Sequence, residues 1–126
     1  MADTDTGIET DETAELIASN KVEGTAVYDR NGDRLGTIYN FMVDKVNGQV
    51  EYAVLSFGGL FGLGTSYYPL PWERLTYDEE LGGYQVDLLK EDLEEAPRYS
   101  AEEQPTFNRA YGEEVDTFYD RNFTTA

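Results

Sequence analysis

The stretch VDKVNGQVEYAVLSFGG, residues 43–59, decides the fold of this chain. It ends one apolar run, turns through Asn47-Gly48 and continues from Gln49 as a run rich in Val, Tyr, Leu and Phe. An Asn-Gly pair between two such runs is a strong short-range signal of a β-hairpin. We therefore expect a hairpin here, with its second strand at the centre of a β-sheet.

Further short runs of β-branched and aromatic residues flank this hairpin, each bounded by a turn signal. They cover residues 25–29, 34–44, 66–70, 75–78 and 84–89. Six short strands joined by tight turns predict an all-β fold, a small antiparallel barrel or curled sheet. The alternation of the second run slips at Asn40-Phe41, which indicates a bulge. After the last strand, only KEDLEEA (90–96) reads as helix, about two turns stopped by Pro97.

The chain divides into three parts. Residues 1–15 are acidic with little apolar content and are expected to be disordered. Residues 16–99 would form the barrel domain. Residues 100–126 form a C-terminal extension, partly helical, in which large apolar residues recur at helical spacing although Gly112 weakens the helix. These residues are Phe107, Tyr111, Val115, Phe118 and Tyr119.

Composition excludes several function classes. The 126 residues hold 26 acids and 9 bases, a net charge of −17, with no cysteine and no histidine. Disulfides, zinc–thiolate sites, thiol catalysis and histidine general bases are therefore excluded. The negative field opposes direct binding of nucleic acid and of anionic membranes. With no secretory signal and no long apolar run, we expect no membrane insertion and a cytoplasmic location.

Two motifs suggest a ligand at first sight. FGGLFGLGTSYYPLPW (57–72) copies P-loop spacing, but Thr65 stands where the lysine must be and a strand follows instead of a helix. DRNGD (29–33) faintly resembles a calcium loop, but Arg34 occupies the glycine position. Turn chemistry explains both motifs, so we expect no catalytic residue, no cofactor and no metal. Two interpretations of Arg74 stay open: a structural pairing with a nearby carboxylate, or an anion-binding site.

The hairpin stretch, together with PLPWERL (69–75) and LEEAP (93–97), resembles the PRC-barrel family. The similarity covers about residues 17–99 and is nearest to free-standing bacterial members. Related domains occur in the photosynthetic reaction centre H subunit and in a ribosome maturation factor. The resemblance implies a six-stranded PRC-barrel with a short helix, no catalytic centre and action through protein–protein contacts. Structural roles are expected for Gly36, Asp44, Gly58, Gly59, Pro71, Trp72 and Pro97, with Trp72 closing one end of the barrel.

The leading hypothesis is therefore a non-enzymatic adaptor that forms a homodimer and binds an unknown protein. Two apolar segments are the predicted partner-binding residues: the loop Leu60, Phe61 and Leu63, and the C-terminal Phe107, Tyr111 and Phe118. The C-terminal residues could equally pack on the barrel of their own chain. The alternatives are a ribosome- or RNA-processing-associated factor and a small-ligand-binding barrel.

Overall fold

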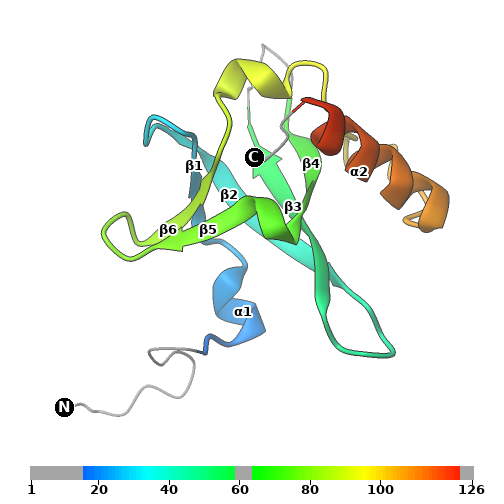
Figure 1. Ribbon diagram of the computed structural model, residues 1–126, viewed down its shortest axis with the longest axis horizontal. Helices are drawn as coiled ribbons and strands as arrows, with labels where there is room; N and C mark the ends of the chain where they lie inside the picture. Colours follow the sequence, from blue (N-terminus) through cyan, green and yellow to red (C-terminus); the bar gives the residue numbers. More distant parts are fainter. Residues whose placement is uncertain (1–15, 59–63, 123–126) are drawn as a thin grey trace.

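The computed structural model describes residues 16–58 and 64–122, in which the strands form one curled, half-barrel sheet (Figure 1). The strands are β1 Ala26–Tyr28, β2 Arg34–Val43, β3 Val50–Phe57, β4 Ser66–Pro71, β5 Leu75–Asp78 and β6 Gly83–Val86. Their order across the sheet is β4-β3-β2-β1-β6-β5. The helical segments are α1 Ser19–Val22, the 3₁₀ turns η3 Trp72–Arg74 and η4 Lys90–Leu93, and α2 Arg109–Asn122. The six predicted strands are all present.

The prediction of a purely antiparallel sheet is wrong, because β1 and β6 pair in parallel. Val27 lies opposite Tyr84, and Tyr28 lies opposite Gln85. Every other neighbouring pair of strands is antiparallel. Tight turns specify antiparallel partners along the chain, whereas β1 and β6 are far apart in sequence and meet only when the sheet curls.

The predicted two-turn helix over residues 90–96 is shorter in the structure, where η4 is a single 3₁₀ turn. Its bonds join residues three apart: the Asp92 amide donates to the Leu89 carbonyl at 3.0 Å. The Asp92 carboxylate in turn accepts the Leu89 amide at 2.8 Å. Leu93 and Ala96 are both buried. The Ala96 amide donates to the Leu93 carbonyl at 3.0 Å, so the spacing of three continues past η4 and places both side chains on one face, towards the core.

Aspartates hold the hairpin turns. At the β2–β3 turn, the Asp44 carboxylate accepts the amides of Val46 and Asn47 at 2.8 and 3.0 Å. At the β5–β6 turn, the Asp78 carboxylate accepts the amides two and three residues further on, at 2.9 and 3.0 Å. Each turn ends on a glycine with positive φ, Gly48 at 79° and Gly82 at 70°. A short carboxylate that reaches its own backbone is the usual chemistry of such turns.

The predicted bulge lies at Tyr39. Ile38 pairs with Leu55 and Asn40 pairs with Val54, so one extra residue stands in β2. The exposed Tyr39 ring lies against Tyr67 of β4, with 4.8 Å between the ring centroids.

The outer edge of β4 is covered by the segment that follows η4. Tyr67 and Tyr99 exchange two backbone hydrogen bonds of 2.9 and 3.0 Å. Their rings stack with 5.5 Å between centroids. One edge of the sheet is thereby closed at this position.

The hydrophobic core lies inside the curl of the sheet and includes side chains from α2. Gly36 is required there, because a Cβ at this position would meet the Ser56 carbonyl and the Phe57 ring. Strands β2 and β3 therefore approach closely at Gly36. The fully buried members of the core are Val27, Ile38, Ala53, Leu55, Phe57, Tyr68, Leu70, Val86, Leu88, Leu93, Val115 and Tyr119.

The corner between β4 and β5 is built by Pro71 and Trp72. Pro71 is buried opposite Tyr52. The Trp72 ring lies between Phe41 and Tyr84, at centroid distances of 6.3 and 5.6 Å. Through these contacts Trp72 joins β2 and β6 across the curl.

Among the other positions predicted to be structural, Pro97 is half-buried after η4. Gly58 has open space where a Cβ would lie, with Thr65 Oγ1 at 3.9 Å, so no close contact requires glycine there. Gly59 lies outside the described residues.

Candidate functional site

Helix α2 brings the predicted C-terminal aromatic residues onto the sheet of their own chain. Tyr111 and Phe118 pack against the core. Val115, which lies between them in the sequence, is fully buried. Phe107 precedes the helix and lies against Tyr52 of β3, at 5.3 Å between ring centroids. Their contacts in the monomer are therefore intramolecular, and a role in binding a partner stays a prediction.

Tyr52 fixes the middle of α2. Its hydroxyl donates to the Asp116 carboxylate at 3.0 Å and lies 3.3 Å from the Gly112 carbonyl. Burial, and then the bond to Asp116, raises the pKa of Tyr52 to about 12. Gly112 leaves room for this contact, because a Cβ there would lie 2.9 Å from the Tyr52 hydroxyl oxygen. The glycine that weakens the helix in the sequence is the residue that lets it dock.

Arg74 fixes the C-terminal end of α2. Its side chain is only 11% exposed, and Nη2 donates to the Tyr119 carbonyl at 2.9 Å. The same nitrogen lies 3.7 Å from the Asp120 carboxylate. A cation at the C-terminal end of a helix is favoured by the helix dipole. Of the two alternatives for Arg74, the structure supports the pairing within the chain.

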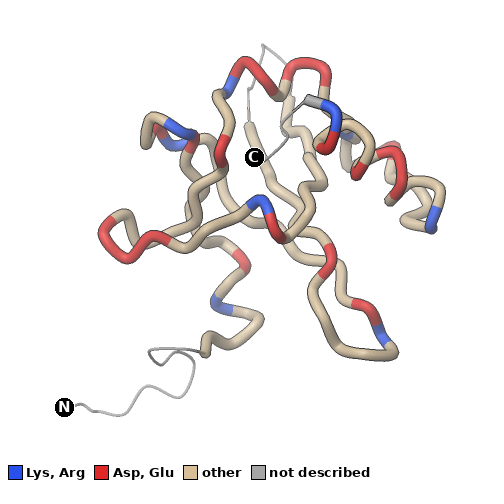
Figure 2. Tube along the Cα trace, in the orientation of Figure 1, with Lys and Arg blue, Asp and Glu red and all other residues tan. Residues whose placement is uncertain are grey.

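A shallow acidic groove runs between the start of β3, η3 and α2. Its volume is about 350 Å³, and four carboxylates line it: Glu51, Glu73, Asp116 and Asp120. Figure 2 shows the predominance of acidic positions along the chain. Such a lining repels phosphates and other anions and attracts cationic groups.

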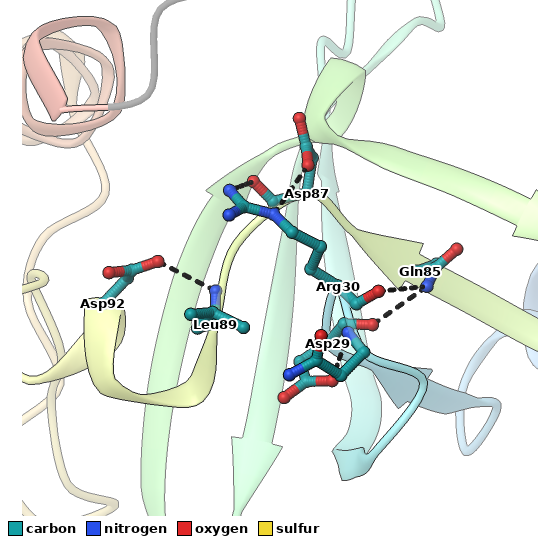
Figure 3. A network of polar contacts seen from close by, with 7 residues as sticks. Asp29, Arg30, Gln85, Asp87, Leu89 and Asp92 are labelled. Carbon is teal, nitrogen blue, oxygen red and sulfur yellow. Dashed lines mark hydrogen bonds and ion pairs between the residues drawn. The ribbon is translucent and has the colours of Figure 1, made fainter.

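The DRNGD segment is held by a polar network that joins the β1–β2 turn to the strand β6 and the residues after it (Figure 3). The Asp29 carboxylate accepts the amides of Asn31 and Asp33, both at 2.9 Å. Arg30 bonds the side chain and the carbonyl of Asp87, each at 3.1 Å. Gln85 donates its amide to the Asp29 carbonyl at 3.0 Å. One carboxylate oxygen of Asp29, which would be a calcium ligand, therefore already accepts two amides of its own turn. The bonds of Arg30 and Gln85 connect this turn to β6 and the residues after it.

The β2–β3 hairpin projects beyond the rest of the sheet as an arm (Figure 1). We define the valine arm as Val43, Val46 and Val50. Val43 and Val50 are paired across the hairpin, and Val46 stands at the tip. Val46 is 93% exposed and Val43 is 45% exposed. Because Asp44 bonds the turn from inside, these apolar side chains are displayed on an ordered backbone.

The predicted loop residues Leu60, Phe61 and Leu63 lie outside the described residues, so the structure neither supports nor opposes them. Reasoning from the sequence missed the valine arm and the contacts of Tyr52 with α2. The exposed valine in KVNG was a usable signal, because a turn tip has no need of an apolar residue. The pairing of Tyr52 with Asp116 had no local signal.

Residues 16–58 and 64–122 contain neither a cluster of metal-ligating side chains nor a membrane-spanning helix. No group of three or more acidic side chains there is placed to hold a metal ion. No helix in the same part of the chain is long and apolar enough to span a membrane.

Comparison with known proteins agrees with the fold. The chain is similar to an uncharacterized protein of Deinococcus radiodurans, with 28% identity over 80 residues. That match covers 64% of this chain but only 28% of the relative, so the chain spans much less than that protein's length. The PRC-barrel domain family matches residues 14–93, which include all six strands. The chain therefore belongs to the PRC-barrel domain family.

Proposed function

We propose that this chain is a non-catalytic protein-interaction module that pairs with a second copy of itself. The observation that carries the proposal is the valine arm, which displays two exposed apolar side chains on an ordered turn. Two arms related by a two-fold axis would bury the same valines against each other, as closed dimers do. Lys45 and Glu51 lie on the same hairpin and could form ion pairs between the copies.

The expected dimer is weak. Burying one valine side chain contributes about 1.5 kcal/mol. Because Val46 is almost fully exposed but Val43 only about half exposed, the two valines from each copy give roughly 4 kcal/mol in the dimer, against an association cost of about 4–15 kcal/mol. Apolar residues of the 59–63 segment would add to this gain if they join the interface.

Salt should strengthen the dimer, which distinguishes it from a charge-driven complex. Each copy carries a net charge of −17, so the two copies repel each other. The Debye length falls from about 10 Å at 0.1 M salt to about 3 Å at 1 M, which screens that repulsion. Apolar burial is not weakened by the same change.

Sedimentation velocity tests the proposal at tens to hundreds of micromolar protein, in low and high salt. We expect a monomer–dimer equilibrium that shifts towards dimer as salt rises. The variant Val43→Thr/Val46→Thr should remain monomeric. Leu60→Ser/Phe61→Ser is the matched variant for the loop, and its effect shows whether that segment contributes. A single monomeric species of the unchanged protein over the whole range would overturn the dimer.

Association with ribosomes through a basic protein is the second candidate, and the acidic groove is the observation that favours it. The groove and the net charge argue against direct contact with RNA. A ribosome pull-down that resists RNase but is lost in high salt would support this candidate. A small-ligand role has less support, because the core of the half-barrel is filled by side chains such as Tyr68 and Leu70.

A further inference from the structure

The two outer edges of the sheet differ. Tyr99 closes the edge of β4 by two backbone hydrogen bonds. Strand β5 pairs with β6 on one side, and no strand of the described residues pairs with it on the other. The outward amides and carbonyls of such an edge are a template for another strand.

Strand β5 lacks several of the devices that protect sheet edges. Its sequence LTYD contains no lysine and no proline, and its register runs without a bulge from Leu75–Val86 to Asp78–Gly83. Thr76 and Tyr77 are exposed, and the Tyr77 ring stands edge-on to Tyr84 at 5.2 Å. Edges of this kind are usually shortened, charged or covered. In β5, only the short length of the strand and the negative charge around it restrict which segments can pair with its edge.

The charge selects the partner. Glu73 precedes the strand, Asp78 is its last residue, and Glu79 and Glu80 continue as the acidic turn of the β5–β6 hairpin (Figure 2). Arg74 does not offset them at the edge, because its side chain is directed to the end of α2. If two copies paired through β5, acids of both copies would be brought together. A basic segment would instead be attracted by these carboxylates.

We propose that the open edge of β5 binds an extended, basic segment of a second protein by β-strand addition. The four residues of β5 span about 13 Å, which limits the pairing to a short segment. This inference rests on the proposed role as a binding module, but not on dimerisation.

The test uses a capped, fluorescein-labelled heptapeptide of alternating lysine and valine, with anisotropy as the readout at low salt. Two further peptides carry N-methyl groups on every second residue, one on the lysines and one on the valines. Because alternate amides face the same edge of a strand, one of these should lose binding at least about ten-fold. Equal binding of all three peptides would mean that charge alone attracts them and would overturn the proposal, as would no binding of the first.

Matched protein variants locate the site. Glu79→Lys/Glu80→Lys changes the acidic turn beside β5, and Glu94→Lys/Glu95→Lys makes the same change in net charge after η4. We expect about ten-fold weaker peptide binding for the first variant and a much smaller change for the second. Equal weakening by both would overturn the proposal. Thermal melts of both variants check that the fold is retained.

Amide NMR completes the test. On addition of the lysine–valine peptide, the amides of Thr76 and Tyr77 should shift, and the outward-facing one should exchange more slowly. Shifts centred instead on the acidic groove at Glu51 and Asp116 would overturn the proposal. The monomeric Val43→Thr/Val46→Thr variant should bind the peptide as the unchanged protein does. Failure of the dimer and failure of the edge site are therefore distinguishable.

Discussion

Gly112 offers a sharp test of how α2 is attached, through the change Gly112→Ala. In an exposed helix, this change stabilises by about 1 kcal/mol because alanine is the better helix former. Here the new Cβ would lie 2.9 Å from the Tyr52 hydroxyl oxygen. That hydroxyl is bonded to Asp116, so it cannot move away without lengthening the bond.

The sign of the effect should depend on residue 52. With tyrosine present, the gain of about 1 kcal/mol is cancelled or exceeded, because displacing a bond to a carboxylate costs about 1–2 kcal/mol in a half-buried site. With Tyr52→Phe, the nearest ring atom is Cζ at 3.5 Å, which is an ordinary contact. Gly112→Ala should then raise the free energy of unfolding by about 1 kcal/mol.

A double-mutant cycle measures this difference. Urea unfolding followed by circular dichroism gives the free energy of unfolding of the unchanged protein, both single variants and the double variant. We expect a coupling energy of about 1–2 kcal/mol between residues 52 and 112. If alanine stabilises both backgrounds equally, within about 0.3 kcal/mol, α2 does not dock against Tyr52 as described.

Three further changes test other contacts. Arg74→Met should lower the free energy of unfolding by about 1.5–3 kcal/mol, because the Tyr119 carbonyl loses a charged donor; hydrogen exchange should quicken first at the end of α2. Gly36→Ala should cost about 2–4 kcal/mol in urea unfolding, since its Cβ would meet the Ser56 carbonyl; an unchanged midpoint would contradict this packing. The amides of the β2–β3 turn hold the pKa of Asp44 below its usual value of 3.8, so the folded state favours the carboxylate. The contribution of Asp44 to stability should be present above about pH 4 and be lost as the pH falls through the lowered pKa. Asp44→Ala should therefore reduce the fall of the melting temperature over that pH range.

Local chemistry made the strands and turns predictable. The Asn47-Gly48 pair predicted the hairpin correctly because a turn is specified by the residues that form it. The bulge near Asn40 was predictable for the same reason, since it appears as a break in the period of two. The helical spacing of the C-terminal aromatic residues predicted α2.

Contacts between distant segments were not predictable in this way. The parallel pairing of β1 with β6 joins Val27 to Tyr84, and no local signal marks it. The bond between Tyr52 and Asp116 joins residues 64 apart in the sequence. The sequence predicted that the aromatic face of α2 needs a cover, but not that the cover is its own sheet. The prediction of partner-binding residues rests on apolarity alone, and apolarity does not distinguish a face that covers its own sheet from one that binds a partner.

The acidic residues of this chain serve two different purposes, and their chemistry separates them. The carboxylates that hold turns are aspartates, as at positions 29, 44 and 78, because a short side chain reaches the backbone amides that follow it. The exposed pairs at 79–80 and 94–95 are glutamates, whose longer side chains extend the charge into solvent. Glutamate-to-glutamine changes should therefore alter association and its salt dependence while the turns remain intact. Aspartate-to-alanine changes in the turns should lower stability first, so the charge that selects a partner can be varied separately from the contacts that form the fold.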